Sequence, residues 1–458
     1  MNYISKRGIS LLALLITFTS ALQAQRGDMQ YFRYYDQRGI NVSENSKTDT
    51  VEFDGFKLRL GANFTQGFQS LKHSNSSGVM LYDLAAGFPL AQANLNIDVQ
   101  LADGVRLNLV SYMSAHHHNE TWVKGGYVQV DKVGFLKSDL MNRLWQNLTL
   151  KVGHMEINYG DAHFRRSDGG NTFWNPFMEN NIMDAFTTEI GGELYWHKKN
   201  VLLMFGMTNG EIQGSVTKAS DRSPSVYGKV GYDHSFGERN RIRLTGSFLS
   251  KSSSISGTLY GGDRTGSNYQ FVMEPSSATL TSNAFAGRMN PNFKDNVVAF
   301  MFNPFLKLGG LELFATLELA QGNSAVENGE IQYAAEANDS SQVKFSKLKI
   351  RQFTQYEADL IYRFGTREQF YAGLKYNSVD GTQAFGLSTT ATTAGGISQG
   401  IRKDISINRA AVGAGWFITR NILVKGEYVS QMYKGFPDGN ILEDGKFDGF
   451  VLQGSIAF

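Results

Sequence analysis

Polar and apolar side chains alternate strictly along several stretches of this 458-residue chain. In residues 91–101, for example, the odd positions are apolar and the even positions are Gln, Asn or Asp. Residues 56–65 and 311–319 repeat the pattern. An alternation of period two predicts β-strands with one apolar and one polar face. These segments have the length of a tilted strand that crosses the apolar layer of a membrane, roughly 9–11 residues.

Sixteen segments of this kind can be assigned along the chain, near residues 55–68, 91–101, 104–113, 122–131, 147–159, 188–197, 200–208, 225–234, 240–250, 295–306, 310–320, 350–363, 368–377, 405–417, 420–431 and 446–458. Short and long connections between them alternate; the long ones are 69–90, 160–187, 209–224, 251–294, 321–349 and 378–404. Short periplasmic turns, long extracellular loops and an even strand number are typical of a transmembrane antiparallel β-barrel. We therefore predict an all-β barrel of about 16 strands.

One connection departs from this pattern, and two soluble folds are alternatives to the barrel. The connection 132–146 is long for a periplasmic turn, and residues 136–144 within it have the composition of a short helix. A periplasmic two-sheet sandwich or a propeller would also show alternating strands, with the apolar faces in a protein core. The long strands, the ordered connections and the absence of a repeat near 40–50 residues favour the barrel over both.

The N-terminal residues indicate export. Lys6 and Arg7 precede an apolar stretch from Ile9 to Leu22, and cleavage after Ala24 is expected. The stretch is shorter than the about 20 apolar residues of a membrane-spanning helix, which disfavours an uncleaved anchor. We expect a signal peptide in residues 1–24, a periplasmic or lumen-associated segment in residues 25–54, and a barrel in the Gram-negative outer membrane in residues 55–458.

Composition excludes several function classes. The 44 Lys and Arg residues nearly match the 42 Asp and Glu residues, without the basic excess of nucleic-acid-binding proteins. The absence of Cys excludes disulfides and thiolate zinc sites. The run His116-His117-His118 is predicted to be a solvated loop, because adjacent residues on an extended chain point to opposite sides. We expect neither a cofactor nor a bound metal.

With the apolar faces toward lipid, the polar faces line the lumen. The lumen-wall candidates are Arg59, Arg106, Arg243, Glu312, Glu318, Arg351, Glu357 and Arg363. Over all the inward positions of the clearest strands, eleven basic and nine acidic residues nearly balance, so no strong ion preference is expected. A barrel of this size leaves an aqueous channel unless part of the chain folds into it.

Residues 160–187 are the candidate for such a segment. This connection is long, and Phe164, Phe173, Trp174 and Phe177 make it unsuited to extend freely into water. Asp161, His163, Arg165, Arg166 and Asp168 supply its charge. Arg165 and Arg166 can pair with Asp161 and Asp168 to brace the segment, or they can set the field in a narrow water column. These two roles are compatible.

The chain stops at Phe458, after an apolar face formed by Phe450, Leu452, Gly454 and Ile456. This resembles the C-terminal signal by which outer-membrane barrels reach the barrel assembly machinery. The strand number, the export signal and the long connection after the fifth strand together resemble the general outer-membrane porins. Within them the chain is most similar to the phosphate-selective porin O and P type, although acids interrupt the ladder of inward basic residues here.

The resemblance implies that the connection after the fifth strand folds into the lumen, with Asp161, His163, Arg165, Arg166 and Asp168 at a constriction. It also implies a homotrimer. The resulting hypothesis is a non-enzymatic porin for passive diffusion of small hydrophilic solutes or ions. One alternative is an uptake channel for a specific or hydrophobic substrate, which would need an apolar lumen path. Another is an outer-membrane enzyme or adhesin, but none of the eight His residues lies in a recognisable nucleophile motif.

Overall fold

The computed structural model describes residues 28–33, 40, 44, 46–48, 50–113, 121–212, 223–252, 257–261, 270–283, 287–329, 332–333, 342–343, 347–388 and 398–458. The expected signal peptide (residues 1–24) and His116-His117-His118 lie outside these residues. Within the described part of the chain, no helix is both long enough and apolar enough to cross a membrane.

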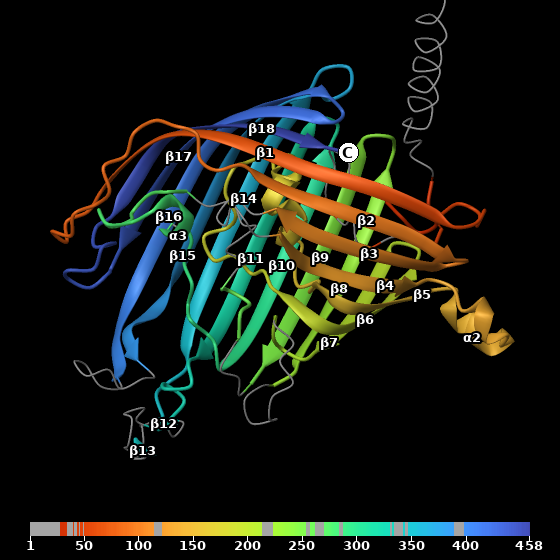
Figure 1. Ribbon diagram of the computed structural model, residues 1–458, viewed down its shortest axis with the longest axis horizontal. Helices are drawn as coiled ribbons and strands as arrows, with labels where there is room; N and C mark the ends of the chain where they lie inside the picture. The colour runs from red at the N-terminus through yellow and green to blue at the C-terminus, as the bar shows by residue number, and fades with distance from the viewer. Residues whose placement is uncertain are drawn as a thin grey trace, which may run out of the picture.

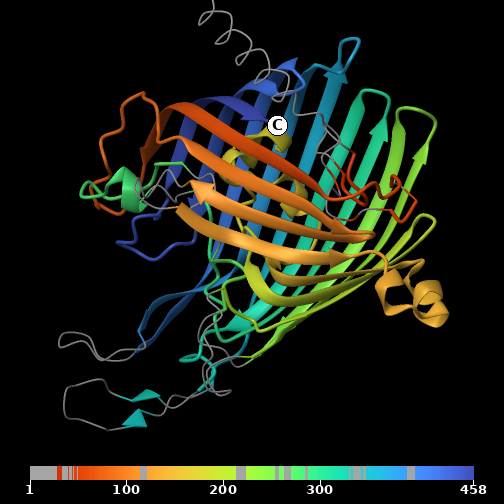
Figure 2. The ribbon, with the colours of Figure 1, turned by 45° about the vertical axis from the view of Figure 1, so that its right-hand side comes forward.

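Sixteen antiparallel strands close into a single barrel, and each of the predicted segments forms one of them (Figures 1 and 2). The strands of the barrel are β1 (Lys57–Ser74), β2 (Gln92–Ala102), β3 (Val105–Met113), β4 (Thr121–Val130), β5 (Leu148–Glu156), β6 (Thr188–Lys198), β7 (Val201–Thr208), β8 (Ser225–Phe236), β9 (Asn240–Lys251), β10 (Asn296–Leu308), β11 (Leu311–Asn323), β14 (Arg351–Phe364), β15 (Phe370–Ser388), β16 (Ser398–Thr419), β17 (Ile422–Lys434) and β18 (Lys446–Ala457). Strands β12 (Gln332–Tyr333) and β13 (Gln342–Val343) form a separate small sheet within the connection that follows β11. The prediction of a closed transmembrane barrel is confirmed.

The first and last strands seal the barrel. Strands β1 and β18 pair from Asn63↔Ala457 to Ser74↔Lys446. Next to the Asn63↔Ala457 pair, the backbone N–H of Phe458 donates to the Ala62 carbonyl at 3.1 Å, and the Ala62 N–H donates to the Phe458 carbonyl at 3.2 Å. Closure leaves no strand edge unpaired, which is what the apolar interior of a membrane requires.

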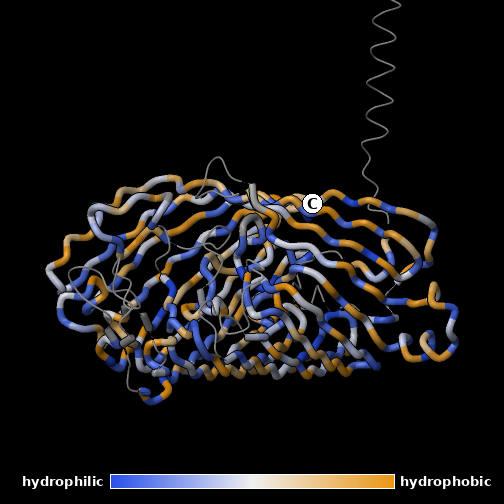
Figure 3. The backbone as a smooth tube through the Cα atoms, turned by 60° about the horizontal axis from the view of Figure 1, so that its bottom comes forward, coloured by the Kyte–Doolittle hydropathy of each residue, from blue (hydrophilic) through white to orange (hydrophobic). Residues whose placement is uncertain are grey.

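The apolar face of the strands points outward. On β11, Leu311, Leu313, Leu317 and Leu319 are exposed, whereas the intervening Glu312 and Glu318 are fully buried inside the barrel. Figure 3 shows the same alternation of hydrophobic and hydrophilic residues around the ring. The outward side chains offer lipid an apolar surface, and the inward polar side chains face one another and the segments inside.

Strands β15 and β16 extend further than predicted, so most of the expected long connection 378–404 is strand. Thr382 and Asp404 lie in this extension, and the Thr382 hydroxyl donates to Asp404 Oδ1 at 2.7 Å. Here polar side chains occupy positions that would be apolar within the membrane. Period-two hydrophobicity therefore does not mark the part of a strand that extends beyond the lipid.

The periplasmic connection 132–146, which is longer than the other short turns, contains the expected short helix. The 3₁₀ helix η1 (Gly134–Leu136) is followed by α2 (Asp139–Trp145), and the side chain of Ser138 caps α2 by accepting a hydrogen bond from Met141 N. The other helices in the described part of the chain are η2 (Ala162–Arg165), η3 (Gly169–Trp174) and α3 (Leu280–Asn283).

The seam between β1 and β18 depends on Gly449. This residue has φ +147°, and a Cβ atom there would collide with the Ser70 carbonyl oxygen on β1. We expect Gly449→Ala to destabilise the barrel by about 1–3 kcal/mol, because the added methyl group strains the backbone at the closing strand pair. The measurement is the midpoint of the heat-dependent shift in gel mobility. Gly454→Ala on the same strand is the control, since a Cβ there meets nothing within 4 Å; equal midpoints for both variants would contradict the prediction.

Candidate functional site

The connection between β5 and β6, residues 157–187, lies against inward-facing side chains of the barrel; we call it the inner loop. On one side, Asn94 Nδ2 of β2 donates to the Asp168 carbonyl at 3.0 Å. On the other side, Lys425 Nζ of β17 donates to the carbonyls of Thr172, Asn175 and Phe177, each at 2.7 Å. These contacts attach the inner loop on both sides of the β1–β18 seam, because β2, β1, β18 and β17 are consecutive neighbours in the ring (Figure 1).

Amide side chains on the strands hold the end of the inner loop. Asn377 Oδ1 accepts from Ile182 N at 2.6 Å, and Gln355 Oε1 accepts from Met183 N at 2.8 Å. Ile182 and Met183 are fully buried. Because these backbone groups find partners on the wall, the loop can be buried without leaving its donors unsatisfied.

Arg165 and Arg166 point to different parts of the barrel. The Arg165 guanidinium pairs with Glu312 of β11 and lies 3.7 Å from Asp359 Oδ2 of β14. Arg166 pairs with Asp184 at 2.8 Å and with Asp168 at 3.4 Å. All these side chains are buried. Arg165 thus attaches the inner loop to the wall, and Arg166 joins parts of the loop to each other.

Asp168 and His163 lie near the β1–β6 part of the wall. Asp168 pairs with Lys124 of β4 and accepts from Tyr112 OH at 3.0 Å. The His163 ring contacts Glu156 Oε1 at 2.6 Å through Nδ1 and Asn158 Oδ1 at 2.9 Å through Nε2. The pairing of Arg166 with Asp168 was expected from the sequence, whereas Asp161 takes other partners.

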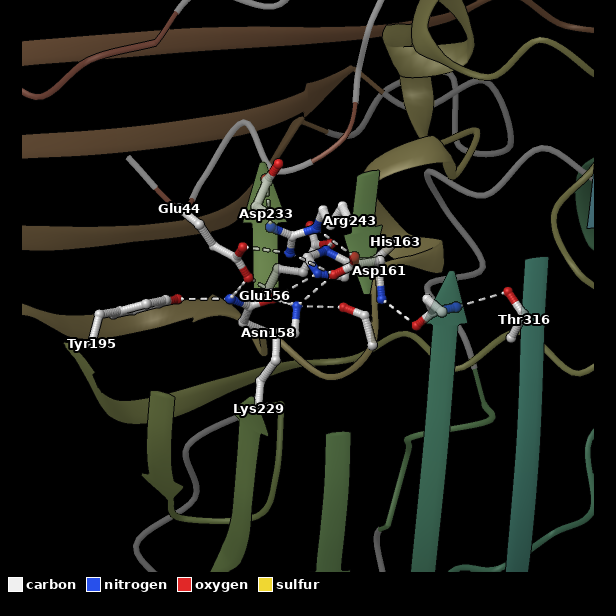
Figure 4. Close-up of polar contacts among 12 residues, drawn as sticks. Glu44, Glu156, Asn158, Asp161, His163, Tyr195, Lys229, Asp233, Arg243 and Thr316 are labelled. Atoms are coloured by element: carbon white, nitrogen blue, oxygen red, sulfur yellow. Dashed lines mark hydrogen bonds and ion pairs between the residues drawn. The ribbon is translucent and has the colours of Figure 1, made fainter. Parts of the chain in front are cut away.

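Asp161 belongs to a buried cluster of four charges, which Figure 4 shows. Arg243 Nε donates to Asp161 Oδ2 at 2.7 Å, and Lys229 Nζ donates to Asp161 Oδ1 at 3.0 Å. The fourth member is Glu44, whose Oε2 accepts from Arg243 Nη2 at 2.6 Å and whose Oε1 accepts from Lys229 Nζ at 3.0 Å. Asn158 Nδ2 also donates to Glu44 at 2.8 Å. Two acids and two bases neutralise one another inside the barrel.

The charges of this cluster control the ionisation of its acids. Burial by itself raises the pKa of Glu44, but Arg243 and Lys229 outweigh it and hold this pKa well below its ordinary value. Burial also acts to raise the pKa of Asp161, and the same two bases again lower it overall. Both carboxyl groups therefore stay ionised at neutral pH.

Glu44 belongs to the segment before β1, which sequence patterns could not place. Ile40 is fully buried and packs with Phe164, Phe305 and Phe314. Lys47 Nζ donates to the Asp131 carbonyl at 2.6 Å and to the Leu148 carbonyl at 2.7 Å. Ile40 and Glu44 are therefore held inside the barrel. Other residues of the same segment are exposed, namely Asp28, Ser46, Thr48 and Thr50. No strand periodicity marks this segment, so Glu44 was not among the predicted site residues. Asn158 of the inner loop was not among them either.

All the lumen-wall candidates face inward, but they form separate contacts rather than one ring. Their partners are Asp98 for Arg59, Gln129 for Arg106, Asp233, Asp161 and Glu44 for Arg243, Arg165 and Arg363 for Glu312, Tyr159 and Tyr260 for Glu318, Glu327 for Arg351, and Lys375 for Glu357. Opposite charges alternate closely, so the wall carries little unbalanced charge.

A cavity of about 600 Å³ lies between the inner loop, the N-terminal segment and the β1–β6 wall. Polar and charged side chains line much of it, among them Arg59, Lys124, Lys151, His163, Arg166 and Glu193. Asp161, Arg165 and Asp168 are not part of this lining. Of the five predicted constriction residues, the structure therefore brings His163 and Arg166 to the cavity.

A second region inside the barrel is apolar. Leu259, Val272 and Phe293, from the connection between β9 and β10, are buried with Met178 and Ile182 of the inner loop. Two long connections thus share a hydrophobic core with inward side chains of the wall. Among the residues that the structure describes, no group of His, Asp and Glu has the arrangement of a metal site.

Comparison with known proteins identifies the fold. No protein-family model matches the chain, and no curated protein matches it in sequence. An anion-selective porin from Comamonas acidovorans superposes with a TM-score of 0.50 at 10% identity, covering 88% of this chain and 100% of that chain. The outer membrane channel DcaP of Acinetobacter baumannii gives a TM-score of 0.47 at 11% identity, over 88% of this chain and 98% of that one. The chain thus has the fold of the 16-stranded outer-membrane porins.

The charge cluster predicts a pH dependence of stability. Folding lowers the pKa of Glu44, so the ionised carboxylate contributes to the free energy of unfolding. This contribution is fully present above the ordinary carboxyl pKa of about 4.3. It is lost as the pH falls through the lower pKa of the folded state. We expect Glu44→Gln to reduce the free energy of unfolding by about 1–3 kcal/mol at pH 7. The difference from the wild-type protein should persist down to about pH 4.3 and shrink only below it.

Urea unfolding of both proteins between pH 7 and pH 3 measures this difference. Glu52→Gln is the matched control, because Glu52 is an exposed acid of the same segment. A Glu44→Gln protein as stable as the control at pH 7 would show that the cluster does not hold the segment.

Proposed function

We propose that the chain is an outer-membrane porin through which small hydrophilic solutes or ions diffuse passively. The observation that carries this proposal is the cavity with a polar and charged lining between the inner loop and the β1–β6 wall. In this proposal the inner loop narrows the barrel, and the path runs along the side that the loop leaves open. Such a path needs no catalytic group, because solutes move down their own gradients.

Charged residues take part in this mechanism in two ways, and Arg166 and Lys124 take part in both, because each also pairs with Asp168. Arg165 and Asp161 brace the inner loop and the N-terminal segment through buried ion pairs. His163 and Arg166 line the cavity, together with Lys124 of β4. We assign the constriction to these three side chains, which act on a passing ion through their charge and hydrogen-bonding capacity.

The pairing of the wall charges bears on the substrate class. Acids pair with most of the basic wall residues, which does not favour a dedicated phosphate pathway. The homotrimer and the role of Phe458 in barrel assembly also remain predictions. The Phe458 side chain is exposed on the barrel, where another protein can reach it.

A matched pair of substitutions tests the path. Lys151 on β5 and Glu193 on β6 are direct register partners, and both line the cavity. We expect Lys151→Gln to shift ion selectivity toward cations and Glu193→Gln to shift it toward anions, because each removes one charge from the same stretch of wall. The measurement is the reversal potential of single channels in a planar bilayer under a salt gradient.

Lys434→Gln serves as the control, since Lys434 is exposed on β17 and lies outside the cavity lining. Opposite shifts for the cavity variants and none for the control would support the proposed path. Conducting channels whose reversal potential is unchanged in both cavity variants would place the path elsewhere in the barrel.

The apolar core inside the barrel favours a second candidate, an uptake channel for a hydrophobic or otherwise specific substrate. In that case the connection between β9 and β10 would have to move before a substrate could pass Leu259 and Phe293. Absence of conductance from protein that shows heat-modifiable gel mobility, together with uptake of an apolar solute into proteoliposomes, would favour this candidate over the porin.

A further inference from the structure

The helix α2 presents an exposed apolar surface at the periplasmic rim of the barrel. Phe135 is 61% exposed, Leu136 50%, Leu140 60% and Leu144 51%. Phe135 and Leu136 belong to η1, and Leu140 and Leu144 lie one turn apart on α2. We call these four exposed side chains the rim patch. Figures 1 and 2 show α2 standing out sideways from the barrel wall below β4 and β5.

The apolar face of α2 includes side chains that contact the barrel and side chains that are exposed. Met141 and Trp145 are half-buried, and the Trp145 indole donates to the carbonyl of Val130, the last residue of β4, at 3.2 Å. At about 100° per residue, Leu144 lies beside Met141 and Leu140 lies beside Leu144, so these residues and Trp145 form one apolar face. The remaining side of the helix carries Asp139, Asn142 and Arg143. The apolar face therefore extends from the barrel outward, along the wall.

The position of α2 places this face at the lower edge of the lipid-facing belt. The outward side chains next along the two adjoining strands are apolar: Val128 on β4 is 37% exposed and Val152 on β5 is 50% exposed. The Trp145–Val130 contact fixes the helix at the end of β4. The space beside the rim patch is thus the space that the inner leaflet of the outer membrane occupies.

Exposed basic residues lie beside the rim patch, where they can meet anionic lipid headgroups. Lys137 and Arg143 are exposed around the rim patch, with Asp139 as the exposed acid of the helix. Basic residues beside an apolar helical face are typical of segments that lie in the plane of a membrane interface and meet anionic headgroups. Four side chains are also few compared with the roughly 20–30 residues per partner of a stable protein interface.

We propose that the rim patch docks into the periplasmic leaflet, with Phe135, Leu136, Leu140 and Leu144 among acyl chains and Lys137 and Arg143 at anionic phosphate groups. The connection 132–146 then acts as a lateral anchor that sets the depth of the barrel in the membrane. Its apolar side chains would otherwise be exposed to water, which the hydrophobic effect disfavours.

Depth-dependent quenching tests this assignment. The chain has no Cys, so Leu144→Cys can carry a single environment-sensitive fluorophore. The labelled protein is placed in nanodiscs of phosphatidylethanolamine and phosphatidylglycerol, with either a headgroup-proximal nitroxide lipid or aqueous iodide as quencher. We expect several-fold stronger lipid quenching at Leu144→Cys than at Asn142→Cys, which carries the same fluorophore on the polar face, and the reverse order with iodide.

Equal iodide quenching at the two positions would overturn the proposal, because the helix would then stand in water. Protection from both quenchers, with cross-linking between copies through Leu144→Cys, would also overturn it and assign the patch to a second copy of the chain. A further variant, Leu140→Asp with Leu144→Asp, should abolish lipid quenching of a fluorophore at Phe135→Cys. Heat-modifiable gel mobility verifies that this variant is folded, and retained quenching in the folded variant would contradict the docking.

Discussion

Closure of the backbone hydrogen-bond ladder is the constraint on which the rest of this structure depends. Lipid offers no partner for an N–H or C=O group, so the strand ring must return to its start at the pairing of β1 with β18. The same constraint fixes which face of each strand is apolar. Once Leu311 and Leu313 face lipid, Glu312 between them must face inward and find partners there.

A closed ring of sixteen strands creates an interior too wide for the side chains of its wall to fill. The chain fills part of this space with the inner loop and the segment that contains Glu44. Buried ion pairs attach both to the wall, and a buried charge is tolerated only where an opposite charge and hydrogen bonds accompany it. Arg243 meets this condition by contacting Asp161, Asp233 and Glu44 together.

This division of charges bears on function. Charges that brace the interior neutralise one another and contribute little to a field in the water path. The charges that line the cavity include Lys151, and Arg166 both lines the cavity and pairs with Asp168 and Asp184. Selectivity in the proposed porin therefore depends on a few side chains beside the inner loop rather than on the total charge of the wall.

The sequence by itself determined the barrel, its strand order, the inward faces and the helix in the connection 132–146, because period-two hydrophobicity and connection length are local properties. It also singled out Arg165, Arg166 and Asp168. Only the tertiary structure decided that Arg165 reaches Glu312, that Asp161 joins Lys229 and Arg243, and that Glu44 enters the barrel. Those contacts join residues far apart in the chain, and the alternation of a single strand does not specify which distant charge a buried group will find.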